Sequence, residues 1–137
     1  MTLRNEQAGP SLIARGVDLN AVGDTFLAVG CNKFIVRRMT VFNASRTLAA
    51  SSATIGAYTG AAAGGSLIST PATKVGLTAA AKWLDCTIAS PATTDVLTAT
   101  AGPSTTNPNQ YGIYIRVGVA DGVATTCDVA FEIESLD

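Results

Sequence analysis

The chain of 137 residues contains no histidine and little charge. Histidine is the commonest general base and the partner that activates serine and cysteine nucleophiles, so its absence removes the usual catalytic dyads and triads. Charged residues make up 14% of the chain, against about 25% in an ordinary soluble domain. A surface so poor in charge is less costly to bury against a partner and suits a freely diffusing monomer poorly. A simple β-protein rich in threonine and serine would also have this composition.

Cysteine is scarce and widely spaced. Cys31, Cys86 and Cys127 form neither a CxxC pair nor an even-numbered framework, so the sequence indicates no disulfide scaffold. Without histidine, a structural zinc site would lack its usual ligands, and we expect no metal and no cofactor. In "WLDCTIA" and "TTCDVAFEI", Cys86 and Cys127 are in phase with apolar positions, which predicts that both are small buried hydrophobes.

Basic patches and long apolar runs are also missing. The 9 basic and 10 acidic residues give a net charge of −1, which does not provide the positive surface that nucleic acids require. No apolar run reaches the roughly 18–20 residues that cross a bilayer. The start, "MTLRNEQAGPSLIARG", lacks the apolar core of a signal peptide. We therefore expect no nucleic-acid partner, no membrane association and no export.

The acidic residues do not form a recognisable catalytic pair. Asp128, Glu132 and Glu134 share one face of one expected strand, which is typical of a solvated outer face. "GAAAGG" matches no phosphate-binding loop. The sequence therefore predicts that the protein is not an enzyme.

The residues that are present favour strands. Short runs of threonine, valine, isoleucine and aromatics alternate with glycine, proline, asparagine and aspartate, which predicts a single all-β domain over residues 11–137 after an N-terminal arm, 1–10. Leu77–Trp83 could form one helical turn instead of a strand. The expected strands are Ser11–Arg15, Thr25–Val29, Lys33–Asn43, Ala53–Thr59, Ser66–Ser69, Lys74–Thr78, Trp83–Ala89, Asp95–Thr100, Gln110–Ala120 and Thr125–Glu134.

Two runs in "QYGIYIRVGVADGVATTCDVAFEIE" alternate between apolar and polar or small residues. Period-two alternation gives each strand one buried and one wetter face. The predicted buried positions are Tyr111, Ile113, Ile115, Val117 and Val119 in the first run, and Cys127, Val129, Phe131 and Ile133 in the second.

The two runs cannot pair through a two-residue turn at Asp121-Gly122, because Ile115 would then lie beside Asp128 on the same face. Either the loop is odd in length, which sets Arg116 against Asp128, or the chain turns a corner between two sheets. The first arrangement suits an immunoglobulin-like sandwich and the second a jelly roll.

"KFIVRRMTVFN" is less regular. Ile35, Met39 and Val41 fall on one face, whereas Phe34, Val36 and Phe42 fall on the other. The pattern indicates a sandwich strand with some exposed apolar residues or, alternatively, one that is covered on both sides.

Four stretches together resemble a group of small β-proteins that tailed bacteriophages encode near their head genes: "FIVRRMTVFNAS", "ATIGAYTGAAAGGSLI", "KWLDCTIA" and "YIRVGVADGVATTCDVAFEI". The resemblance covers about residues 10–134, and the ending "FEIESLD" departs from the group's glycine-containing close. It implies a virion structural protein with an antiparallel β-sandwich, a jelly roll rather than an immunoglobulin-like fold. It also implies a head decoration (cement) protein, made in the bacterial cytoplasm, that binds the major capsid protein on the head surface as a homotrimer.

On this reading the contacts with capsid subunits come from the arm and from the loops Gly60–Gly65 and Ala101–Gln110. The candidate contact residues are Leu3, Arg4, Pro10, Ala62, Gly64, Pro103 and Pro108. The alternative is a receptor-binding or carbohydrate-binding module of a phage tail or fibre, with Tyr58, Trp83 and Tyr114 as stacking residues. Convergence of these three on one open groove would favour the module, and a buried Trp83 would favour decoration.

Overall fold

The computed structural model describes residues 11–89, 97–98, 100–102 and 111–136, and these form an antiparallel β-sandwich. The all-β prediction is confirmed. The predicted N-terminal arm, with Leu3, Arg4 and Pro10, lies outside the described residues. No described helix is long and apolar enough to cross a membrane.

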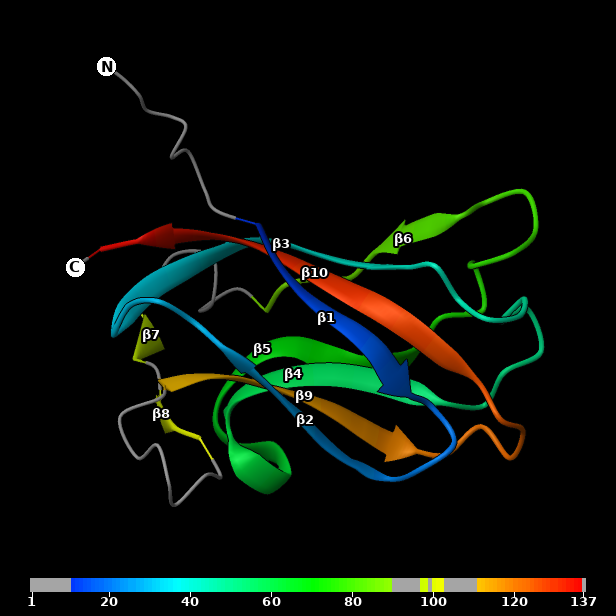
Figure 1. The fold of residues 1–137 in the computed structure, drawn as a ribbon, viewed down its shortest axis with the longest axis horizontal. Helices are drawn as coiled ribbons and strands as arrows, with labels where there is room; N and C mark the ends of the chain where they lie inside the picture. Colours follow the sequence, from blue (N-terminus) through cyan, green and yellow to red (C-terminus); the bar gives the residue numbers. More distant parts are fainter. Residues whose placement is uncertain (1–10, 90–96, 99, 103–110, 137) are drawn as a thin grey trace.

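Two sheets pack face to face. Sheet A has the order β1-β10-β3-β6, with the short β7 beside β3, and sheet B has the order β2-β9-β4-β5, with the short β8 beside β9. Figure 1 shows β1, β10, β3 and β6 in one layer and β2, β9, β4 and β5 in the other. The strands are β1 (Ser11–Asp18), β2 (Gly23–Ala28), β3 (Lys33–Phe42), β4 (Thr54–Gly60), β5 (Gly64–Thr73), β6 (Trp83–Asp85), β7 (Leu97–Thr98), β8 (Thr100–Ala101), β9 (Tyr111–Val119) and β10 (Thr126–Ser135).

The last two long strands do not form a hairpin. β9 belongs to sheet B and β10 to sheet A, so the chain turns a corner at Asp121-Gly122. Arg116 consequently does not face Asp128. Its Nη1 lies 3.3 Å from Asp24 of β2, and Asp128 instead accepts from Arg15 of β1 at 3.3 Å.

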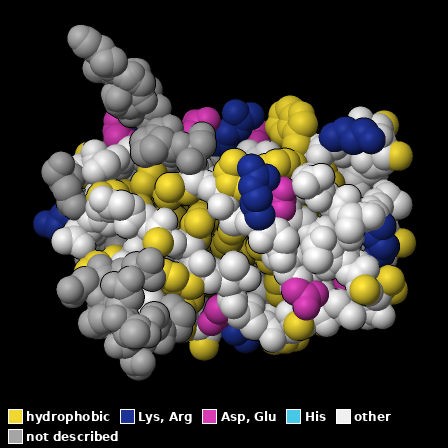
Figure 2. Space-filling view, viewed as in Figure 1, with side chains coloured by type: hydrophobic (Ala, Val, Ile, Leu, Met, Phe, Trp, Pro, Cys, Tyr) yellow, Lys and Arg dark blue, Asp and Glu magenta, His cyan; other side chains and the backbone are white. Residues whose placement is uncertain are grey.

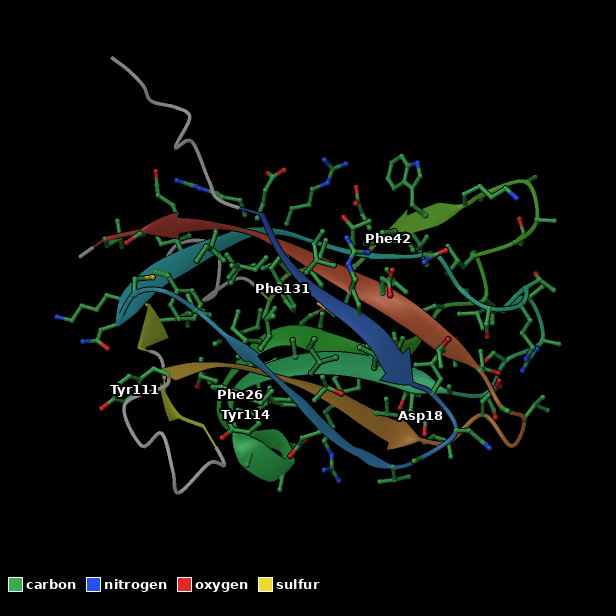
Figure 3. The ribbon with its side chains drawn as sticks, viewed as in Figure 1. Asp18, Phe26, Phe42, Tyr111, Tyr114 and Phe131 are labelled. Carbon is green, nitrogen blue, oxygen red and sulfur yellow. The ribbon has the colours of Figure 1, made fainter. Side chains whose placement is uncertain are left out.

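The core lies between the sheets and matches the predicted alternation. Ile113, Ile115 and Val117 of β9 face Val129, Phe131 and Ile133 of β10 across it, and all six are buried. Figure 3 shows Phe131 between the two layers. Full burial of such a side chain stabilises the fold by about 1.5–3 kcal/mol. Val119 was predicted on the buried face and is instead exposed, because β9 leaves the sandwich there.

A β-bulge explains the irregular pattern of β3. Val36 pairs with Ile133 and Arg38 pairs with Glu132, so Arg37 is an extra residue between them. An extra residue reverses which side chains face the core. Phe34 and Val36 before the bulge and Met39 and Val41 after it therefore all point inward and are buried. The predicted explanation of a sandwich strand with some exposed apolar residues holds for Ile35 and Phe42, which lie on the outer face and are half-buried.

Some predicted elements differ from the structure. Lys74–Thr78 is a turn, and β5 extends to Thr73 instead. Leu77–Trp83 contains no helical turn, and its strand begins only at Trp83. The "TGAAAGGSL" loop is a short 3-10 turn, η2 (Ala61–Ala63), followed directly by β5.

Candidate functional site

The first group of polar residues belongs to the quoted "NAS" and "TTCDV" motifs. Asn43 ends β3 with φ of 54°, a left-handed conformation that asparagine adopts more readily than most residues. Its amide donates to Asp128 at 2.9 Å, and the backbone NH of Gly16 donates to the same carboxylate at 2.9 Å. These bonds, that from Asn43 first, lower the pKa of Asp128. The prediction of a solvated face is therefore wrong for Asp128, which is buried.

A second group joins the "VRRMT" and "KWLD" motifs. Arg38 of β3 donates from Nε and Nη2 to both carboxylate oxygens of Asp85 in β6, at 3.0 and 3.1 Å. Thr40 donates to the same carboxylate at 2.9 Å. The bond from Arg38 holds the pKa of Asp85 below its usual range. The Arg38 guanidinium also lies 5.6 Å from the centre of the Trp83 ring, within the range of a cation–π contact.

A third group ties together the loops at one end of the sandwich. Asp121, whose side chain is 1% exposed, accepts from Ser51 at 2.7 Å and from Thr125 at 2.6 Å, and it pairs with Arg46. The bonds from Thr125 and Ser51 lower the pKa of Asp121. The Asp121 NH donates to the Leu19 carbonyl at 2.8 Å. One residue, Asp121, thus connects the β3–β4 and β9–β10 loops through its carboxylate and the β1–β2 loop through its backbone NH.

The same end of the sandwich carries exposed valines. Gly23 at the start of β2 pairs with Val117 near the end of β9, and Thr54 at the start of β4 pairs with both Val119 and Thr73. The chain segments that adjoin these strand ends therefore lie at the same end of sheet B, across its width from β2 to β5. They present Val22, Val75, Val119 and Val123, each about half exposed. We call these four valines the loop-end surface.

Two charges beside the loop-end surface are withdrawn from solvent, and two others near it, Asp24 and Arg116, are partly exposed and pair with each other. Lys74, next to Val75, and Asp121, two residues before Val123, are both largely inaccessible to solvent. A protein–protein contact typically has exposed apolar side chains on a rigid framework. Charged residues are depleted at its centre. Figure 2 shows few charged side chains on one face of the molecule, and some basic side chains there lie beside acidic ones.

The predicted contact loop Gly60–Gly65 lies elsewhere, against sheet B. Turn η2 contacts β2, β4, β5 and β9, and the Ala62 NH donates to Asp24 of β2 at 2.8 Å. Ala62 is exposed, whereas Gly64 is only half-exposed at the start of β5. Pro103, Pro108 and nearly all of the loop Ala101–Gln110 lie outside the described residues.

The three predicted stacking residues do not converge. Tyr58 and Tyr114 pair directly across β4 and β9 in sheet B, whereas Trp83 belongs to β6 of sheet A. Tyr114 is only 5% exposed, although it points away from the core. Trp83 is not buried either, with 56% of its surface exposed. Convergence of the three residues would have favoured the binding module, and a buried Trp83 would have favoured decoration. The structure shows neither arrangement.

Trp83 instead borders a groove of about 780 Å³ between the β3–β4 and β5–β6 loops. Its apolar lining includes Phe42, Ala44 and Leu77, and its polar lining includes Asn43, Thr78 and Lys82. The volume falls within the range of about 300–1,000 Å³ of ordinary ligand pockets. We call it the Trp83 groove.

Two of the three cysteines are buried in the core. Cys86 and Cys127 are buried as predicted, and burial raises the pKa of both thiols, that of Cys127 to about 12. Within the part of the chain that the structure describes, histidine, cysteine, aspartate and glutamate form no cluster of three that could hold a metal ion.

Sequence reasoning missed the loop-end surface and the Trp83 groove. The valines had a signal: "NAVG", "TKVG" and "DGVA" place a single valine in segments that otherwise read as turns, where an apolar side chain has no core to enter. The groove had none, because its lining comes from segments that are separated in the sequence.

Comparison with family models, with curated proteins and with solved structures finds no match for this chain.

Proposed function

We propose that this protein is a virion structural protein of a tailed bacteriophage, a decoration (cement) protein that binds the outside of the head. On this proposal it is made in the bacterial cytoplasm, assembles as a homotrimer and contacts the major capsid protein. Its function is mechanical: binding across neighbouring subunits stabilises the shell by linkage to the bound state, and cyclic assembly lets one weak contact act several times.

The observation that carries the proposal is the loop-end surface. Four half-exposed valines lie at one end of the sandwich, and two of them, Val22 and Val123, stand on loops that buried Asp121 ties together. A rigid apolar surface loses little conformational entropy when it binds another protein. The carboxylates Asp85, Asp121 and Asp128 each accept hydrogen bonds from two or more neighbours, so they serve the fold rather than a reaction.

We further infer that the sandwich is a jelly roll. The first and last strands, β1 and β10, lie side by side in sheet A. Connections repeatedly cross from one sheet to the other, as between β1 and β2, β2 and β3, and β9 and β10. Two sheets connected in this way are consistent with the jelly-roll arrangement of two Greek keys, which occurs in viral capsid domains.

Cryo-electron microscopy of intact virions from the source phage tests the proposal. We expect trimeric density on the outer head lattice, with the loop-end surface toward capsid subunits. Density at the tail or fibre, or none on the virion, would refute a decoration role. The tail-module alternative has lost its predicted platform, because Tyr58 and Tyr114 belong to a different sheet from Trp83.

Variants identify the surface that binds. Purified capsids should co-sediment with the wild-type protein and with Ala62→Asp, which changes the η2 turn. The double variant Val22→Asp/Val123→Asp should lose co-sedimentation, because two carboxylates would have to be desolvated on binding. If Ala62→Asp loses co-sedimentation and the valine variant keeps it, the capsid contact is made by the predicted loop Gly60–Gly65 instead of the loop-end surface.

A further inference from the structure

The Trp83 groove combines an exposed aromatic ring with a concave apolar floor. The chain has a single tryptophan, and 56% of its surface is exposed beside Phe42 and Leu77. Tryptophan is large and mostly apolar, so leaving it uncovered is unfavourable unless something binds there. Elsewhere in sheet B, Tyr114 also points outward, but the protein itself covers it.

The ring is held in one orientation by its neighbours. Asp85 receives two hydrogen bonds from Arg38, and the guanidinium lies 5.6 Å from the ring centre. Thr40 fixes the same carboxylate from β3 at 2.9 Å. An aromatic side chain that is oriented before binding loses less rotational freedom when a ligand stacks on it.

The charge along the groove has one sign. Its described lining contains two basic side chains, Arg46 and Lys82, and no acidic one. The Arg46 guanidinium is already paired within the protein, so it is not available to a ligand. It pairs with Asp121, and it donates to Thr125 at 2.8 Å and to the Thr47 carbonyl at 3.1 Å. Lys82 is exposed and forms no ion pair with the described residues. The groove therefore offers one available cation.

We propose that the Trp83 groove binds an acidic saccharide, a sugar chain with a carboxylate on its repeating unit. The C–H face of a pyranose ring would lie on the indole, whose π face carries partial negative charge. Asn43, Thr47 and Thr78 line the groove; each makes a hydrogen bond within the protein, to Asp128, to the Leu77 carbonyl and from the Ala81 NH, and its remaining donor and acceptor capacity would serve sugar hydroxyls. The carboxylate would pair with Lys82.

The lining favours a sugar over other anionic ligands. A nucleic acid would need several cations along its backbone, and only Lys82 is available. An acidic peptide is less suited to a short groove with one aromatic platform and three hydroxyl or amide side chains, because it presents few hydroxyls to them. This inference goes beyond the proposed function, and its test uses the isolated protein, so either proposal can fail without the other.

Intrinsic fluorescence tests the inference directly, because Trp83 is the only tryptophan. The wild-type protein is titrated at low salt with tetragalacturonic acid, and in parallel with a neutral tetrasaccharide, a tetraglutamate peptide and a deoxynucleotide tetramer. We expect a saturable change with the uronate and at least about tenfold weaker binding of the other three.

Two matched charge variants locate the carboxylate. Lys82→Gln should weaken uronate binding about tenfold, whereas Lys33→Gln, the same change in β3, should leave it unchanged. Calorimetry with Trp83→Ala should detect no binding by a protein whose unfolding midpoint is close to that of the wild type. The inference is overturned if the uronate gives no saturable change, if the neutral sugar, peptide or nucleotide binds as tightly, or if Lys82→Gln binds like the wild type.

Discussion

Both sheets of the sandwich carry aromatic side chains on their outer faces. The protein covers Tyr114 on sheet B but leaves Trp83 on sheet A exposed. In sheet B, Phe26, Tyr114 and Tyr58 lie opposite one another across β2, β9 and β4. Phe26 and Tyr114 have ring centres 5.2 Å apart, and Figure 3 shows both rings beside the η2 turn. In sheet A, Phe42 and Trp83 also lie opposite one another, but Trp83 stays exposed.

The difference comes from the connections rather than from the strands. The β4–β5 connection folds back onto sheet B and is held there by the bond from the Ala62 NH to Asp24. Sheet A has ion pairs on its outer face instead: Arg15 with Asp128, Arg37 with Glu134 and Arg38 with Asp85. Burial of an outward aromatic residue thus depends on a turn, and the face without such a turn keeps its tryptophan accessible.

Replacing the covered aromatic should have the largest effect on stability. Tyr114→Ala should lower the free energy of unfolding by about 3 kcal/mol, because it empties a buried site between Phe26 and the turn. Trp83→Ala should cost less than about 1 kcal/mol, since its ring is half exposed. Urea denaturation measures both changes, and Tyr114→Phe is the control that keeps the ring. Equal losses for Tyr114→Ala and Trp83→Ala would contradict the comparison.

Displacing the covering turn should have the next largest effect. Gly65 has φ of 69°, and an added Cβ would collide with Thr59 Oγ1 and lie 2.9 Å from the Gly60 backbone nitrogen. Gly65→Ala should therefore cost about 2–4 kcal/mol from backbone strain and overpacking together.

Gly122→Ala is the matched control for Gly65→Ala. Gly122 has φ of 86° but open space around it, so its substitution should cost about 1–2 kcal/mol from strain alone. The unfolding midpoints of the two variants measure the difference. A Gly122→Ala variant as unstable as Gly65→Ala would show that the close approach of Thr59 and Gly60 to Gly65 contributes nothing.

The smallest expected effect on stability is the loss, at acid pH, of the stabilisation that Asp121 gives to the loops. Hydrogen bonds from Thr125 and Ser51 lower the folded pKa of Asp121 below its unfolded value of about 3.9. The resulting stabilisation is present above the unfolded pKa and disappears as the pH falls through the folded one.

Asp121→Asn should therefore be less stable than the wild type at pH 7, and the gap should narrow below about pH 4. Thermal unfolding at pH 7 and pH 3 measures the gap. Ser51→Ala, which removes one of the donors, should give a smaller loss at pH 7. A gap that is the same at both pH values would mean that ionised Asp121 does not stabilise the loops.

Much of the fold follows from local pattern. The alternation in Tyr111–Val119 and Thr126–Ser135 correctly predicts the residues of β9 and β10 that enter the core, apart from the exposed Val119. The parity argument correctly restricts Asp121-Gly122 to an odd-length loop or a corner. In β3, alternation does not predict which side chains enter the core. The extra residue Arg37 reverses which face the following side chains point to, and no local sequence signal marks this bulge.

The candidate sites were less predictable because they depend on distant contacts. Asn43 and Asp128 are 85 residues apart in the chain, and Arg38 and Asp85 are 47 apart. The "NAS" and "KWLD" motifs therefore could be recognised, but their hydrogen-bond partners could not. Tyr58, Trp83 and Tyr114 were selected as candidate stacking residues, yet pattern alone did not assign them to separate sheets.

By itself, the sequence determined that this protein is a charge-poor β-sandwich with buried thiols, because strand periodicity and composition act residue by residue. Only the tertiary structure decided which outward aromatic is covered, which aspartate is buried and where the four valines gather. Those properties depend on which strands lie side by side and where each turn folds back, and both are set by packing of the whole chain.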